Sequence, residues 1–181
     1  MPRYSMTTAL AGAAAAAALL VSGAPVAGAV ESSQARVVTY DAGQAAEFQA
    51  AVDKAAEVWN GQVRNVKLQK ATGGQADVTV LADDQWPRTQ TDSLGKGTVW
   101  MGRAAVGEGH FIPRIATHEL GHIFGLPDNR TGDCTDLMSG ASAGPSCKND
   151  LPNPEEKAEV DQNFAQGAAI RPQLFTESPA G

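Results

Sequence analysis

The chain has 181 residues, of which 43% are hydrophobic, and a formal net charge of −6. This acidic balance excludes nucleic acid and anionic membrane surfaces as partners, because both are bound through basic patches. The length suits a single domain with one hydrophobic core.

Residues 1–29 have the pattern of a secretory signal peptide. Arg3 supplies a positive start, an Ala- and Leu-rich core follows, and Ala27-Gly28-Ala29 is a small-residue cleavage site. The apolar core is shorter than the ~20 residues that a membrane helix requires. We therefore expect a secreted, extracellular protein in which residues 30–36 are a short propeptide or a disordered N-terminus and residues 37–181 form one domain.

Both cysteines, Cys134 and Cys147, lie in the predicted exported part. In an oxidising compartment we expect them to form a disulfide. The chain between them is rich in Gly, Ala, Ser and Pro, so an unlinked loop would be mobile, and closing a loop of this size contributes ~3 kcal/mol. Two thiolates are too few for a closed structural zinc site, which has four ligands.

The first half of the domain has strand and helix patterns in alternation. Residues 36–40, RVVTY, are β-branched and aromatic and predict a strand. Apolar residues at helical spacing predict a helix over residues 44–60, with Gly61 as its C-cap. Residues 66–70 and 76–83 alternate in hydrophobicity and predict two neighbouring strands.

In the middle of the chain, residues 84–96 are polar and predict a loop. The stretch 97–103, GTVWMGR, predicts one more short strand, and residues 104–109 again predict a loop.

The rest of the chain predicts two helices separated by an irregular segment. The first covers residues 112–124, with Pro113 in its first turn, and the second covers residues 154–168. Residues 125–151 contain many Gly and Pro and no clear period, so we expect an ordered irregular segment held by the disulfide.

The stretch THELGHIFGLPDN, residues 117–129, begins in the first of these helices and continues into the irregular segment. On a helix, His118 and His122 project from the same face and can share one metal ion. Glu119 lies beside that position, where it can accept a proton from water. Gly125 can adopt a left-handed conformation and turn the chain back, which brings Asp128 to the histidines as a third ligand.

Two neutral nitrogens and one carboxylate suit Zn²⁺. Three protein ligands leave the fourth position open to water, which is typical of a catalytic zinc site. The sequence therefore predicts one catalytic Zn²⁺ bound by His118, His122 and Asp128.

The motif H-E-x-x-H-x-x-G-x-x-D resembles that of the metzincin metalloproteases, in the variant with Asp as the third ligand. Met138, ten residues beyond Asp128, is similar to the methionine of the Met-turn beneath the zinc in that clan. With one disulfide and a domain of this size, residues 37–169 resemble the snapalysin family of small secreted bacterial neutral proteases.

The resemblance implies an α+β fold with a single metzincin-like domain. It would contain a small mixed β-sheet, an N-terminal helix, a zinc-binding active-site helix, the Met-turn and a C-terminal helix. It also implies that residues 37–181 are the catalytic domain of a zinc endopeptidase, with Glu119 as general base and a preference for an aromatic residue after the cleaved bond.

Two features depart from the family pattern. Gly140 stands where many metzincins have a tyrosine that approaches the zinc, so no tyrosine is available to stabilise an oxyanion. Phe111 and Pro113 stand where the resemblance suggests side chains that hold a calcium ion, and neither has a side-chain oxygen. Calcium is therefore not predicted.

A peptide substrate would pair as an extra antiparallel strand with an exposed sheet edge, for which we expect residues 97–103. Residues 139–144 would form a wall of the pocket beyond the cleaved bond. His110 is expected in a loop, whereas Trp86 and Trp100 suit either the cleft or packing. The expected partners are protein or peptide substrates of a monomer.

Two other interpretations remain open. A secreted binding protein could keep this fold without turnover, although such relatives usually lose the glutamate, and Glu119 is present. A gluzincin-like peptidase would take its third ligand from Glu155 or Glu156, which also have a simple explanation as acids in the first turn of a helix.

Overall fold

The computed structural model describes residues 1–3 and 34–178. Almost all of the predicted signal peptide, residues 1–29, lies outside the described residues, and its cleavage stays a prediction. Within the described part of the chain, no helix is long and apolar enough to cross a membrane.

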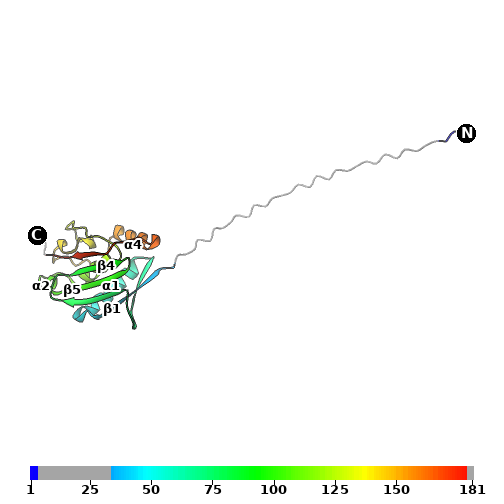
Figure 1. The fold of residues 1–181 in the computed structure, drawn as a ribbon. Coiled ribbons are helices and arrows are strands. Elements are labelled where there is room, and N and C mark those ends of the chain that lie inside the picture. Colours follow the sequence, from blue (N-terminus) through cyan, green and yellow to red (C-terminus); the bar gives the residue numbers. More distant parts are fainter. Residues whose placement is uncertain (4–33, 179–181) are drawn as a thin grey trace. The chain divides into compact units, whose positions relative to one another are not determined.

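The domain is built on one six-stranded sheet with the order β2-β1-β3-β5-β4-β6. Neighbours among β1, β2, β3 and β5 pair in parallel, and β4 pairs antiparallel with both β5 and β6. The strands are β1 (Arg36–Gln44), β2 (Val66–Lys70), β3 (Val78–Asp83), β4 (Arg88–Ser93), β5 (Lys96–Gly102) and β6 (Gln173–Thr176). Together with the helices, this mixed sheet confirms the predicted α+β class (Figure 1).

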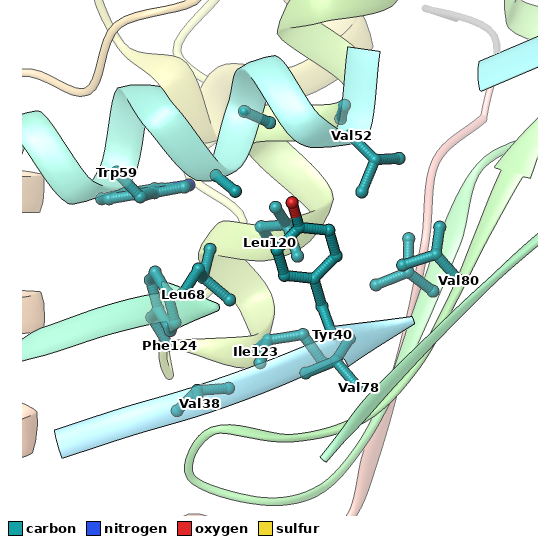
Figure 2. Close-up of a cluster of buried hydrophobic side chains, with 14 of the residues drawn as sticks. Val38, Tyr40, Val52, Trp59, Leu68, Val78, Val80, Leu120, Ile123 and Phe124 are labelled. Carbon is teal, nitrogen blue, oxygen red and sulfur yellow. The ribbon is translucent and has the colours of Figure 1, made fainter. Parts of the chain in front are cut away.

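Within the described residues, four α-helices and two 3₁₀-helices accompany the sheet. They are η1 (Ala46–Phe48), α1 (Gln49–Gln62), α2 (Arg103–Gly107), α3 (Ile112–Ile123), η2 (Leu137–Ala143) and α4 (Pro154–Gln166). The core lies where α1 and α3 face the strands, and Figure 2 shows Trp59, Leu120 and Phe124 pointing toward the side chains of β1 and β3. Trp59 packs edge-to-face on Phe124 at 5.3 Å between ring centroids. Its indole Nε1 donates to the Thr117 carbonyl, which fixes α1 against α3.

The expectation that residues 66–70 and 76–83 form neighbouring strands is wrong, because β1 lies between them. Lys70 of β2 and Val78 of β3 both align with Tyr40, from opposite sides of β1. The chain therefore needs only a short link to cross β1 at this level, and the Ala71 N–H donates to the Tyr40 carbonyl. Alternation within each strand predicted both strands but carried no information on which edge of β1 each would take.

Two stretches predicted as loops are regular. Residues 88–93 form β4, whose buried positions are Thr89 and Thr91. Because its inward side chains are threonines, the strand lacks the apolar alternation that would have revealed it. Residues 103–107 form the short helix α2, which begins at the last residue of the predicted strand 97–103 and covers most of the stretch 104–109 that was predicted as a loop.

The predicted helix over residues 44–60 begins and ends later than expected. After η1, α1 continues through Gly61 to Gln62, so Gly61 is not the C-cap. Val63 leaves the helix directly in an extended conformation, with φ −123° and its N–H bonded to the Trp59 carbonyl, so no left-handed residue is needed. The helix predicted over residues 112–124 is confirmed as α3.

The helix predicted over residues 154–168 is confirmed as α4, which ends two residues earlier than expected. Asn153 and Glu156 form a capping box at its start, in which each side chain bonds the other residue's backbone N–H.

The segment between α3 and α4 is irregular, as predicted, and contains the Cys134–Cys147 disulfide. The disulfide is not alone in ordering it. Arg114 of α3 is buried, and its guanidinium donates to the carbonyl oxygens of Asp136 at 2.6 Å and Asn149 at 2.9 Å. A single planar fork thus ties both flanks of this segment to the helix that carries the histidines.

Candidate metal centre

His118 and His122 lie one turn apart on the buried face of α3, with their Nε2 atoms 3.1 Å apart. Their Nδ1 atoms contact backbone carbonyls, His118 that of Leu137 at 3.1 Å and His122 that of Leu126 at 2.8 Å. A carbonyl can only accept, so each Nδ1 carries the proton and each Nε2 turns its lone pair toward the other. Two facing lone pairs at this distance repel unless a cation lies between them.

Asp128 reaches the same point from the turn after α3. Gly125 has φ +89°, the left-handed conformation predicted for it, and the chain reverses there. Asp128 Oδ1 lies 3.4 Å from the Nε2 atoms of both histidines. Among the described residues, this buried oxygen has no hydrogen-bond partner.

These three atoms fit a metal ion. In a tetrahedral site with bonds of ~2.0–2.1 Å, ligand atoms are about 3.3 Å apart, close to the 3.1 and 3.4 Å found here. Both the facing lone pairs and the unpartnered oxygen of Asp128 would be satisfied by one cation.

The charges also favour a cation at this point. Burial lowers the pKa of His118, but Asp128 and Glu177 outweigh it and raise the pKa to about 10, so without a metal ion a proton on Nε2 takes the place of the cation. Burial lowers the pKa of His122, and the neighbouring charge on His118 lowers it further, so the pair favours one positive charge. Burial raises the pKa of Asp128, yet the two imidazoles hold it well below its usual range.

Glu119 is fully buried beside the histidines. Its Oε2 accepts a hydrogen bond from Thr89 Oγ1 of β4 at 2.6 Å, while Oε1 has no partner among the described residues. Burial raises the pKa of Glu119 to about 8; His118 and the Thr89 hydroxyl act in the opposite direction. One carboxylate oxygen is therefore fixed by the sheet, and the other is free to take up a proton.

Glu177 is a fourth candidate metal ligand at this site, and the sequence did not predict it. Its Oε1 lies 2.9 Å from His118 Nε2, and the four residues offer ligand atoms within 4.8 Å of one another. Burial raises the pKa of Glu177, but hydrogen bonds with His118 and Arg130 lower it to about 2.

Met138 lies against α3 beneath the histidines. A Cβ added to Gly121 would come within 2.8 Å of Met138 Sδ, so the glycine lets the methionine approach the helix. The Met138 N–H donates to Glu156 Oε1 at 2.7 Å, and its carbonyl accepts from Asn129 N–H at 2.8 Å. The structure therefore brings together the predicted Met138 and the histidine helix, and Glu156 is used to hold that turn.

A pocket opens next to Glu119 and His118. Its lining is mostly apolar or aromatic and includes Trp86, Pro87, Ala105, Phe111, Ile115 and Ala141, together with His110 and Gly140. Trp86 therefore belongs to the cleft and stands edge-on to His110, which lies in the turn between α2 and α3. Trp100 instead packs under the guanidinium of Arg88 at 4.6 Å.

The expected substrate edge at residues 97–103 is wrong. This stretch forms β5, which is paired on both sides, with β3 and β4. Buried Val99 and Met101 explain the pattern, because an apolar strand suits the middle of a sheet. The strand beside Glu119 is β4, through Thr89.

Comparison with known proteins identifies the class. Residues 35–167 match the Streptomyces extracellular neutral proteinase (M7) family. The chain is 39% identical over 132 residues to an extracellular small neutral protease of Streptomyces caespitosus, covering 72% of this chain and 98% of that one. A protein of the same name from Streptomyces coelicolor is 39% identical over 134 residues, covering 73% of this chain and 61% of that one.

Among solved structures, an archaemetzincin from Methanopyrus kandleri matches with a TM-score of 0.47 and 15% identity, covering 75% of this chain and 98% of that one. The two-histidine motif, the buried glutamate and the family match together define a metal-dependent protease. The chain belongs to the Streptomyces extracellular neutral proteinase family. This confirms the resemblance to the small secreted neutral proteases that the sequence indicated, and with it the extracellular location.

Proposed function

We propose that this chain is a secreted endopeptidase that hydrolyses peptide bonds in extracellular proteins with one Zn²⁺ held by His118, His122 and Asp128. The observation that carries the proposal is the convergence of two Nε2 lone pairs and the unpartnered Asp128 Oδ1 on one point. Two nitrogens and one oxygen form a donor set that Zn²⁺ prefers. When bound, Zn²⁺ supplies Lewis acidity that polarises a peptide carbonyl and acidifies water.

Glu119 is the general base. Its free Oε1 takes the proton from the attacking water and passes it to the nitrogen of the leaving peptide. Thr89 holds the other oxygen at 2.6 Å, so the carboxylate keeps one orientation through both transfers. A pKa raised toward neutrality by burial suits a group that must both accept and release a proton near pH 7.

The apolar pocket beside Glu119 takes the side chain that follows the cleaved bond. Its aromatic and aliphatic lining supports a preference for an aromatic residue there. Gly140 and Ala141 contribute to this lining, in line with the expectation that residues 139–144 form a wall of the pocket. Peptides that differ only in Phe or Asp after the cleaved bond would test this preference through kcat/KM.

The proposal is tested by casein digestion with Glu119→Gln. The amide keeps the size of the side chain but cannot accept the proton, so we expect unchanged zinc content and hydrolysis at least ~10²-fold slower. Glu155→Gln is the matched control, because Glu155 is exposed in the first turn of α4. A zinc-loaded Glu119→Gln protein that digests casein at the parent rate would refute the role of Glu119 as general base.

The same assay separates the remaining alternatives. If the parent protein binds zinc but digests nothing, with or without a chelator, the interpretation as a binding protein without turnover is favoured. The gluzincin-like alternative requires Glu155 or Glu156 at the metal, yet the Glu156 carboxylate bonds the backbone N–H groups of Met138 and Asn153. Loss of zinc from Glu155→Gln would revive it.

A further inference from the structure

The C-terminal segment Gln173–Glu177 lies along the cleft, and it is outside the family match, which covers residues 35–167. Its first four residues form β6, the red strand beside β4 in Figure 1. The two strands pair antiparallel, with Phe175 opposite Thr89 and Gln173 opposite Thr91. Thr89 is the residue that orients Glu119. The segment therefore pairs with the edge of β4 that β5 does not use. An extended peptide substrate would take the same position beside the catalytic base.

Glu177 connects the two walls of the cleft. Its N–H donates to the Pro87 carbonyl at 2.9 Å, just before β4. Its Oε2 accepts from the Ala141 N–H at 2.7 Å, on the segment after Met138, and from Arg130 at 2.9 Å. Its Oε1 lies 2.9 Å from His118 Nε2 and belongs with the other three candidate ligand atoms to a group within 4.8 Å, so the carboxylate lies within reach of the fourth position of the metal site.

From Leu174 to Glu177 the side chains alternate between solvent and the site. The Phe175 ring stacks on the His122 imidazole, with centroids 4.0 Å apart and planes 7° apart. Leu174, the residue before it, is 55% exposed. The contact with the metal-binding histidine is thus made by one face of β6, as expected for a strand that docks on a site.

Gly140 provides a separate observation. It has φ +57°, and a Cβ at this position would lie 2.5 Å from Glu177 Oε1 and 2.7 Å from Oε2. No residue larger than glycine is compatible with the carboxylate in this place. The position at which the resembled metzincins have a tyrosine is therefore empty of side chain here, and Glu177 fills the space.

We propose that the segment Gln173–Glu177 is an internal inhibitor of this protease. β6 takes the place of a substrate strand on β4, and Glu177 supplies the fourth protein ligand to the metal. A site with four protein ligands has no position for water, whereas a catalytic site keeps one open. This inference rests on the proposed function, since it assigns the inhibitor to the same metal site, and substrate must displace the segment before hydrolysis begins.

The first test needs neither metal nor activity. Chelator-treated protein is exposed to dilute chymotrypsin, and cleavage after Phe175 is followed by mass spectrometry. Glu177→Ala removes the bonds to Ala141, Arg130 and His118, so we expect cleavage at least ~10-fold faster than in the parent. Leu174→Ala is the matched control on the same strand and should retain the parent rate. Equal rates for the parent and Glu177→Ala would overturn the proposal.

The second test probes the fourth position directly. Protein loaded with Co²⁺ is titrated with acetohydroxamic acid, and the visible absorption of the cobalt reports binding. We expect at least ~10-fold tighter binding to Glu177→Ala than to the parent or to Leu174→Ala, because the probe no longer competes with the carboxylate. Glu177→Gln keeps the shape of the side chain without the charge and should give an intermediate affinity. If the parent bound the probe as tightly as Glu177→Ala, the Glu177 carboxylate would not occupy the fourth position, and the proposal would be wrong.

Casein digestion then separates the two proposals. If the segment Gln173–Glu177 inhibits an active protease, Glu177→Ala should digest casein at least ~10-fold faster than the parent. All variants could be inactive while Glu177→Ala still increases chymotrypsin cleavage and hydroxamate binding. In that case the proposed function fails, but the placement of Gln173–Glu177 at the metal site stands. If the parent is fully active and Glu177→Ala is no faster, the endopeptidase stands and the internal inhibitor is refuted.

Discussion

The two halves of the domain differ in the kind of residue that they bury. The buried residues of β1, β2, β3, η1 and α1 are all hydrophobic, whereas the buried polar and charged residues of the described chain lie in β4, in α3 and in the segments after it. We call the first set the sheet half and the second the site half. The first half follows the ordinary preference of protein cores, and the second places charges where burial is costly.

The difference shows what each half requires to be stable. Apolar side chains such as Val38, Phe48 and Val80 need only neighbours of the right shape. The buried groups of the site half need partners, and Arg114 finds them in backbone carbonyls. Asp128 Oδ1 and Glu119 Oε1 lack such partners among the described residues, which leaves them for a cation and a proton. The sheet half should therefore be indifferent to a metal ion and the site half should not.

The largest effect is expected from Phe48→Ala in the sheet half. Phe48 is 1% exposed and belongs to the apolar core. Removing a buried aromatic ring should lower the free energy of unfolding by ~3–5 kcal/mol. Urea unfolding would measure this change, and zinc affinity of the folded variant should match that of the parent. A large loss of zinc affinity would mean that the two halves are coupled through the core.

The disulfide gives the next effect, and it lies in the site half. Cys134→Ser combined with Cys147→Ser should lower the free energy of unfolding by ~3 kcal/mol, as estimated for a loop of this size. Unlike Phe48→Ala, it should also weaken zinc retention, because the bridged loop carries Met138. Metal analysis after dialysis against a chelator would show this. A double variant with the parent's unfolding midpoint would mean that the contacts of Arg114 hold the loop without the bridge.

The two halves also differed in what the sequence could predict. The motif on α3 was found because local spacing alone places His118 and His122 on one face of a helix. Asp128 followed from the same local reasoning, since Gly125 had to turn the chain back. The order of the strands was not accessible in this way, because β1 pairs on both edges and the sequence does not say which partner takes which edge.

The parts of the site that the sequence missed come from far along the chain. Glu177 meets His118 across 59 positions, after a strand of only four residues that gives no periodic pattern. β4 was missed because Thr89 and Thr91 face inward in place of apolar residues. The space above Gly140 was the one local signal: the absence of a tyrosine was noticed, and what fills that space depends on tertiary contacts.

A third prediction compares two aspartates within the site half. Asp128→Ala should weaken zinc binding at least ~10²-fold, since even residues that only support a metal ligand contribute 10- to 100-fold. Asp133→Ala is the control, because the exposed Asp133 carboxylate accepts only from Thr135 nearby. Competition with a chromophoric chelator would give both affinities. Equal zinc affinities for the two variants would remove Asp128 from the ligand set. A bound metal would then no longer explain the unpartnered Asp128 oxygen in the site half.

The smallest effect is expected from Asp77→Asn, which tests whether the sheet half responds to acid without metal. Asp77 Oδ2 accepts from the Thr39 N–H at 2.9 Å and the Thr39 hydroxyl at 2.8 Å. The bond from the Thr39 backbone holds the pKa of Asp77 below its ordinary value of 3.8, although burial acts against it. A lowered pKa in the folded state means that the charge stabilises the fold above pH 3.8 and that this contribution is lost as the pH falls further.

Because Asp77 is only partly buried, solvent screens its charge, and Asp77→Asn should cost only about 0.5–1 kcal/mol at pH 7. Urea unfolding in the presence of a chelator, at pH 7 and at pH 3, would measure it. The parent and the variant should differ at pH 7 and converge at pH 3, while the exposed Asp92→Asn should match the parent at both. If the difference between the parent and Asp77→Asn persisted at pH 3, its cause would be the altered hydrogen bond and not the charge. The acid sensitivity of this domain would then have to be sought in the site half alone.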